Sequence, residues 1–120
     1  MKIIRETRVP FAIKGGGHSS NPGFSSTRGV HIAMRRFCKI TFHENNQTVD
    51  VGAGAIWNEV YRALEPYNVS VVGGRTVGIG VGGLALGGGY GLKSNQYGLT
   101  IDNVFEYEVR TNCSLQSSLT

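Results

Sequence analysis

The chain has 120 residues, which is the length of one domain or less. It is too short for a large cofactor-binding domain and a complete substrate-binding domain together. The net charge of +4 comes from scattered basic residues, without the basic stripe and interleaved aromatic residues of nucleic-acid-binding modules. We therefore expect no nucleic-acid partner.

Composition excludes several other classes of protein. Glycine occurs 18 times, about twice its usual share, and no low-complexity run accompanies it, so disorder is not expected. No apolar stretch reaches about 18 residues, so no membrane span is predicted. Cys38 and Cys113 are too few for a disulfide scaffold and lack the spacing of a zinc site. Glycosylation acceptors at Asn46, Asn68 and Asn112 matter only in the secretory pathway, and the compartment stays open.

The N-terminal half is predicted to consist of short strands. Ile3 and Ile4 resemble a helical turn, and the polar residues 44–47 predict a hairpin turn. The strands are expected at residues 11–14, 30–34, 39–42 and 48–51. Between the first two strands lies a glycine-rich loop, residues 15–29.

The C-terminal half contains the clearest helix. Apolar residues recur at helical spacing over 56–65, and Pro66 ends the pattern. Further strands are predicted at 69–72 and 104–109, and a helical turn at 81–86 within the glycine-rich block 73–91. We expect an α+β fold with one clear helix and two glycine-rich loops, in a partial domain over 1–112, and an unstructured tail over 113–120.

The first glycine-rich loop has the composition of an anion site. Successive glycines after a strand expose backbone N–H groups, which form nests for pyrophosphate oxygens, and serine hydroxyls add donors. The loop opens with Lys14, Gly15, Gly16, Gly17, His18, Ser19 and Ser20. His18 could bind a metal, act as a base, bond to a cofactor or simply cap a turn. A metal is disfavoured because His31 and His43 fall in separate strands.

The second block matches a dinucleotide-binding pattern in spacing but not in context. Gly78, Gly80 and Gly83 stand at the first, third and sixth positions, and Asp102 follows at the distance of a ribose-binding acid. A Rossmann module binding NAD is thus an alternative, although residues 87–89 break the required helix. Two glycine loops could instead approach opposite parts of one long ligand. Tight packing is the competing interpretation, which we favour less because glycine within packed elements costs about 1 kcal/mol.

Taken in order, the motifs resemble the PCMH-type FAD-binding domain of the vanillyl-alcohol oxidase superfamily, nearest to the fungal berberine-bridge-enzyme-like oxidoreductases. The resemblance covers about residues 1–112 and rests on the segments 14–20, 73–75, 81–91, 95–99 and 102–103. It implies a covalent bond between His18 and the flavin 8α-methyl carbon. It also implies that Gly15, Gly16, Gly17, Ser19 and Ser20 bind the pyrophosphate and that Lys14 belongs to the same cofactor site. By the same resemblance Gly78, Gly80, Gly82 and Gly83 line the isoalloxazine ring, and Tyr97, Gly98 and Asp102 lie near the ADP half.

The resemblance further implies an FAD-dependent oxidoreductase. Its parent enzyme would oxidise an alcohol, a sugar or a natural product, and dioxygen would accept the electrons. Family members carry a substrate-binding domain with the catalytic base, so no catalytic residue is assigned to this chain, and we expect the isolated chain to be inactive. The alternative is a truncated, non-catalytic remnant that does not bind FAD stably.

Overall fold

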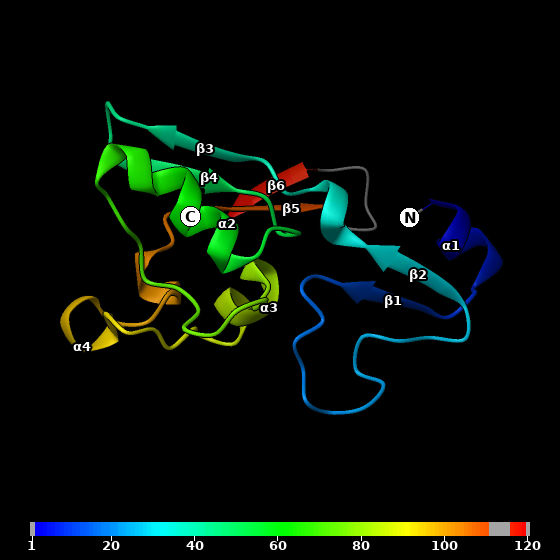
Figure 1. Cartoon of the computed structure of the whole chain (residues 1–120). Coiled ribbons are helices and arrows are strands. Elements are labelled where there is room, and N and C mark those ends of the chain that lie inside the picture. The colour runs from blue at the N-terminus through cyan, green and yellow to red at the C-terminus, as the bar shows by residue number, and fades with distance from the viewer. Residues whose placement is uncertain (1, 111–115, 120) are drawn as a thin grey trace.

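The computed structural model describes residues 2–110 and 116–119, and these form a mixed α+β structure (Figure 1). In chain order the elements are α1 (Lys2–Thr7), β1 (Phe11–Lys14), β2 (Val30–Ala33), η1 (Met34–Arg36), β3 (Ile40–His43), β4 (Thr48–Val51), α2 (Trp57–Leu64), η2 (Glu65–Tyr67), α3 (Val81–Leu86), α4 (Ser94–Tyr97), η3 (Ile101–Asn103), β5 (Tyr107–Arg110) and β6 (Gln116–Leu119). The predicted fold class is confirmed.

The described strands form three two-stranded sheets. β1 pairs in parallel with β2, from Phe11 opposite Val30 to Lys14 opposite Ala33. β3 and β4 form the predicted antiparallel hairpin, and β5 pairs antiparallel with β6. Because β1 and β2 run in the same direction, the first glycine-rich loop starts at the edge of the sheet where η1 also begins.

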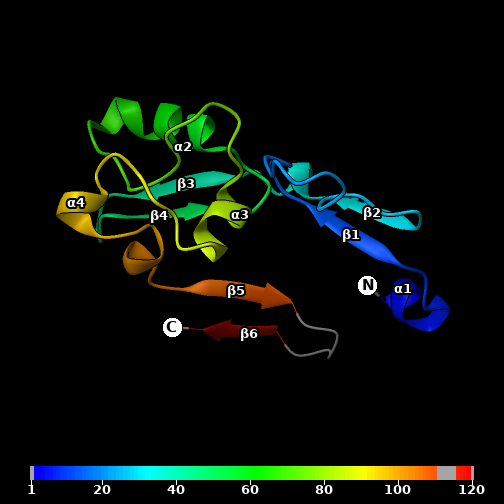
Figure 2. The same cartoon turned by 90° about the horizontal axis from the view of Figure 1, so that it is seen from below.

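The core lies where α2 packs against the β3–β4 hairpin and α3 (Figures 1 and 2). Val60 and Leu64, one helical turn apart on α2, are almost fully buried, and Ala55, Trp57 and Val81 complete the cluster. The pair β1–β2 lies to one side of this core in both views. The second glycine-rich block follows α2 and returns across it to α3.

An ion pair connects the segment after β2 to the start of α2. The Glu59 carboxylate accepts a hydrogen bond from the Ile56 backbone N–H at 3.1 Å, which stabilises the first helical turn. It also binds the Arg35 guanidinium with both oxygens, one at 2.7 Å. Arg35 further donates to the Gly54 carbonyl at 3.3 Å. The segment after β2 is therefore fixed to the segment that leads into α2.

Two predicted strands differ in the structure. Residues 69–72 form no strand: the chain bends at Val72, whose side chain is buried, and the segment pairs with no strand among the described residues. The strand predicted over 104–109 is β5, which starts at Tyr107.

The C-terminal part also departs from the prediction. Gln116–Leu119 form β6, whereas the sequence predicted no regular structure there. Pairing with the backbone of β5 supplies hydrogen bonds that these polar side chains do not signal. Residues 113–115 and 120 of the predicted tail lie outside the described residues, and the domain boundary at 112 stays a prediction.

Candidate functional site

The first glycine-rich loop offers unpaired backbone donors at the end of β1. Within the described part of the chain, the N–H groups of residues 16–20 donate to no protein group, while the Asn21 N–H donates to Ser19 Oγ at 3.3 Å. Gly17 adopts φ +69°, a left-handed conformation that glycine accepts readily. The Lys14 side chain lies directly against Gly17. A row of free N–H groups beside an ammonium group suits pyrophosphate oxygens.

His18 lies in this loop with an exposed side chain. The other histidines lie elsewhere: His31 is on β2, and His43 Nε2 is 2.9 Å from Asp50 Oδ2 across the β3–β4 hairpin. Among the described residues, no three His, Cys, Asp or Glu side chains gather as a metal site would require. The imidazole of His18 is therefore free to face a ligand bound by the same loop.

The two glycine-rich regions meet at Gly16 and Gly80. A Cβ built on Gly16 would lie 2.7 Å from the Gly80 Cα and 2.9 Å from the Gly78 carbonyl oxygen. A Cβ on Gly80 would lie 2.8 Å from the Gly16 Cα. These distances allow no side chain at either position, so the two backbones are in direct contact. The structure thus brings together the first two predicted groups of site residues.

Glycines of the second block fall into two kinds. Cβ atoms on Gly73 and Gly74 would overlap the Trp57 indole, one on Gly89 would overlap Thr100, and one on Gly91 would meet the Gly73 carbonyl. Tight packing, the less favoured interpretation, is therefore correct for these glycines.

Other glycines of the block face open space. No atom outside the chain neighbours lies within 4 Å of a Cβ built on Gly78, and none outside the neighbours and the backbone of α3 lies within 4 Å of one on Gly83. A Cβ on Gly82 would be 3.1 Å from the Ala53 carbonyl oxygen. The open sides of Gly78 and Gly83 fit the flat face of a ring, where a side chain would intrude. The site formed by the two glycine-rich loops therefore fits a flavin nucleotide.

The third predicted group lies apart from this junction. Tyr97 ends α4, which both views place far from the first glycine-rich loop (Figures 1 and 2). The Asp102 carboxylate accepts a hydrogen bond from the Leu99 N–H at 2.7 Å and lies against Gly98, whose φ is +79°. Asp102 thus stabilises a turn, and a cofactor role for these three residues stays a prediction.

This geometry overturns the Rossmann alternative. The run from Gly78 to Gly83 follows an irregular segment, not a strand of a parallel sheet, and it contains an isolated antiparallel bridge between Gly80 and Ile56. The helix after it, α3, has only 6 residues. Asp102 lies in η3 instead of at the end of a strand. The NAD-binding interpretation is therefore wrong.

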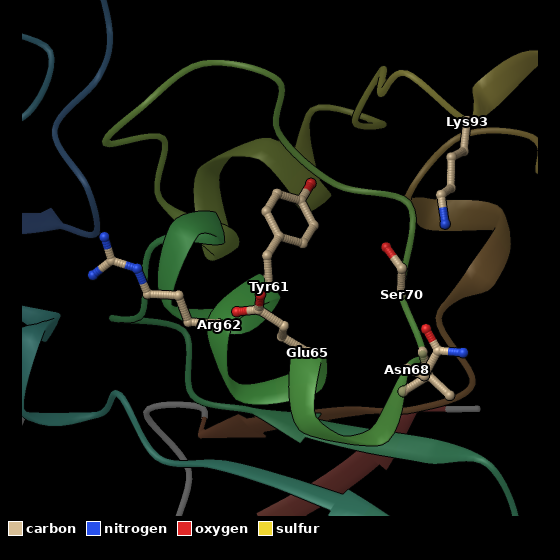
Figure 3. A pocket seen from close by; sticks show the side chains of 7 residues that line it. Tyr61, Arg62, Glu65, Asn68, Ser70 and Lys93 are labelled. Atoms are coloured by element: carbon tan, nitrogen blue, oxygen red, sulfur yellow. The ribbon is translucent and has the colours of Figure 1, made fainter.

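A separate surface hollow of about 580 Å³ lies at the other end of α2 (Figure 3). Its lining consists of Tyr61, Arg62, Glu65, Asn68, Val69, Ser70 and Lys93. None of the predicted cofactor residues lines it. The Tyr61 hydroxyl donates to the Gly74 carbonyl at 2.9 Å, and burial raises the pKa of this phenol. This hydrogen bond fixes the second block to α2.

Two residues at the start of α2 contact the glycine junction without having been predicted from the sequence. Asn58 Oδ1 accepts a hydrogen bond from the Gly78 N–H at 3.1 Å, and the Trp57 N–H donates to the Ile79 carbonyl at 3.0 Å. The sequence places Asn58 on the polar side of a helix, and this position gives no indication of such a contact.

No helix of the described residues is long and apolar enough to cross a membrane.

Comparison with known proteins agrees with the geometry. The chain is 46% identical over 110 residues to the FAD-dependent monooxygenase tpcD of Cochliobolus heterostrophus, covering 91% of this chain and 21% of that protein. Its fold matches BBE-like 1 of Physcomitrella patens with a TM-score of 0.86 and 28% identity, over 97% of this chain and 26% of that one. It matches the glucooligosaccharide oxidase of Acremonium strictum with a TM-score of 0.75 and 29% identity, over 84% and 22% of the respective chains.

The chain thus spans about a fifth of the length of the curated relatives it matches. A family profile described as FAD binding domain matches residues 1–113. The resemblance predicted from the glycine motifs is confirmed, and the chain belongs to this family of FAD-binding domains of oxidoreductases.

Proposed function

We propose that this chain is the cofactor-binding part of an oxidoreductase in which His18 carries FAD covalently. The supporting observation is the contact between Gly16 and Gly80, which joins the loop that carries His18 to the loop with open glycine faces. A ligand held by both loops would have its charged part at one and its flat part at the other. FAD has both parts, and when bound it supplies the hydride acceptor of the reaction.

The residues of the first loop have different proposed roles in binding FAD. Gly15, Gly16 and Gly17 present backbone N–H groups to the pyrophosphate, and Ser19 and Ser20 add hydroxyl donors. Lys14 contributes positive charge from beside Gly17. The exposed imidazole of His18 forms the covalent bond, which keeps the cofactor from dissociating.

The second block completes the site. Gly78 and Gly83 leave room for the ring system, Gly82 is proposed to lie beside it, and Gly80 keeps the two loops in contact. Tyr97, Gly98 and Asp102 are proposed to lie toward the ADP half. The glucooligosaccharide oxidase of Acremonium strictum contains a 6-S-cysteinyl, 8α-N1-histidyl FAD. Residues 73–91 of this chain contain no cysteine, so we propose the histidyl bond alone.

The parent enzyme is proposed to oxidise an alcohol, a sugar or a natural-product carbon. FAD held by Gly15, Gly16, Gly17 and His18 would supply the two-electron acceptor for this oxidation, and dioxygen would be the final electron acceptor. Structures similar to this chain include a xylooligosaccharide oxidase and a berberine bridge enzyme, which supports a small-molecule substrate.

The covalent bond can be tested directly. The chain is expressed with FAD and precipitated in acid, and the absorbance of the pellet is read near the flavin bands. We expect yellow protein from the wild type and from His31→Ala, and a colourless pellet from His18→Ala. Colour that stays in the supernatant for the wild type, or in the pellet for His18→Ala, would overturn the assignment.

A second candidate is a remnant that does not hold FAD by itself. Its support is the exposure of large apolar side chains in and just after the second glycine-rich block, with Val77 at 76%, Leu86 at 79% and Leu92 at 84%. Equilibrium dialysis of the chain against FAD decides between the two. Retained FAD with a cooperative thermal transition contradicts the remnant, and neither being observed supports it.

A further inference from the structure

We infer that Asn58 is a positioning residue that holds the second glycine-rich loop in the conformation required for the flavin. The inference rests on the proposed function and adds to it a residue outside both glycine-rich segments. Asn58 lies in the first turn of α2, is partly buried, and makes one side-chain contact with that loop, to Gly78.

The contact continues a short antiparallel pairing. Residues 55–57 run beside residues 79–81: the Val81 N–H donates to the Ala55 carbonyl at 3.0 Å, and the Trp57 N–H donates to the Ile79 carbonyl at 3.0 Å. The isolated bridge between Ile56 and Gly80 sets this register, in which Asn58 stands opposite Gly78. At Asn58 the backbone has already turned into α2 and can no longer serve as the pairing strand. The side-chain oxygen accepts the next hydrogen bond in its place.

Gly78 depends on this bond more than its neighbours do. Its φ of +83° is one of many conformations open to glycine, so the residue type does not itself restrain the backbone. Beyond its chain neighbours, no atom lies within 4 Å of the position a Cβ would occupy. Packing therefore does not hold Gly78 from its open side. The next residue toward the N-terminus, Val77, is 76% exposed. The hydrogen bond from Gly78 N–H to Asn58 Oδ1 is thus the local restraint on this part of the loop.

The position of Gly78 also bears on the first loop. Its carbonyl oxygen lies 2.9 Å from the place where a Cβ of Gly16 would be, beside the contact between Gly16 and Gly80. A change in the backbone at Gly78 would move the surface against which the pyrophosphate loop packs. Asn58 thereby connects the start of the core helix to both halves of the proposed cofactor site.

Two matched variants separate positioning from general stability. Asn58→Leu keeps a similar volume but removes the acceptor. Asn58→Asp keeps an oxygen at the same place and suits the first turn of a helix. Hydrogen exchange at the Gly78 amide reports the bond itself, and the FAD retained after gel filtration reports its consequence.

For Asn58→Leu we expect exchange at Gly78 to rise at least tenfold and FAD retention to fall several-fold, with exchange in the buried turns of α2 unchanged. Asn58→Asp should restore both values to near those of the wild type. The inference is overturned if Asn58→Leu leaves hydrogen exchange at Gly78 unchanged. It is also overturned if exchange at Gly78 rises but FAD retention stays at the wild-type value. Failure of Asn58→Asp to rescue either readout would do so as well. A wild type that never binds FAD instead overturns the proposed function, and the inference about the cofactor falls with it.

Discussion

The two glycine-rich segments of this chain use the same residue for opposite purposes. In the first, residues 16–20 are largely exposed and their N–H groups are free to bind a ligand. In the second, Gly73, Gly74 and Gly91 are buried, because the Trp57 indole and neighbouring backbone occupy the space of a side chain. Glycine content alone therefore does not identify a ligand site. An open side is what we expect of a glycine that faces a ring, and in the second block Gly78 and Gly83 have one.

The largest effect is expected where glycine serves packing. Gly73→Ala places a methyl group inside the Trp57 ring, and we expect the free energy of unfolding to fall by about 3 kcal/mol. Urea denaturation measures the change. In a Trp57→Leu background the same substitution should cost much less, because the obstructing ring is gone. Equal costs in both backgrounds would show that Gly73 is not limited by the indole.

A smaller loss is expected where the two segments meet. Gly16→Ala forces apart two backbones that cannot move aside as a side chain could, and we expect a loss of about 2 kcal/mol in stability together with loss of FAD retention. Gly15→Ala is the matched control, since its Cβ would make an ordinary contact at 3.6 Å with the Ala53 carbonyl oxygen. If both variants bind FAD alike, the junction is not part of the cofactor site.

Local pattern predicted the elements whose side chains decide their own structure. The polar turn residues 44–47 between two short strands and the helical spacing over 56–65 indicated the hairpin and α2 within one or two residues. The order of the motifs along the chain also indicated the cofactor family, through its resemblance to the FAD-binding domain, and this resemblance is confirmed. These predictions depend on residues that are neighbours in sequence.

What the sequence could not predict depends on tertiary contacts. Residues 69–72 have strand composition, yet Val72 is buried against the core. β6 forms because β5 offers a backbone partner. The pairing of Asn58 with Gly78 spans 20 residues and requires the register of the bridge between Ile56 and Gly80.

Gly83 differs from the packed glycines of the second block, because it serves neither packing nor a turn. Gly83 lies within α3 with an open side, so Gly83→Ala should raise the free energy of unfolding by about 0.5–1 kcal/mol. If that side faces the flavin, FAD retention should fall in the same variant. Gly82→Ala is the control with less room, its Cβ being 3.1 Å from the Ala53 carbonyl oxygen. A stabilised Gly83→Ala chain that binds FAD normally would remove Gly83 from the site.

The smallest effect concerns the link between the two regions. The Arg35 guanidinium and the Ile56 N–H lower the pKa of Glu59 from its ordinary 4.5 to about 2. A carboxyl group with a lowered pKa contributes stability above its unfolded pKa, and this contribution is lost as the pH falls from about 4.5 toward 2. Because the pair is largely solvent-screened, we expect a loss of about 0.5 kcal/mol.

Denaturation at pH 6 and at pH 3 measures this loss. Glu59→Gln keeps an acceptor for the Ile56 N–H but carries no charge, so it should lower stability at pH 6 and lose less of it on acidification than the wild type. Glu44→Gln, in the exposed turn of the β3–β4 hairpin, is the control for removing one carboxylate. If Glu59→Gln and the wild type lose equal stability between the two pH values, the ion pair does not stabilise the attachment of the segment after β2 to α2. Contact between the glycine-rich loops would then depend on backbone packing alone.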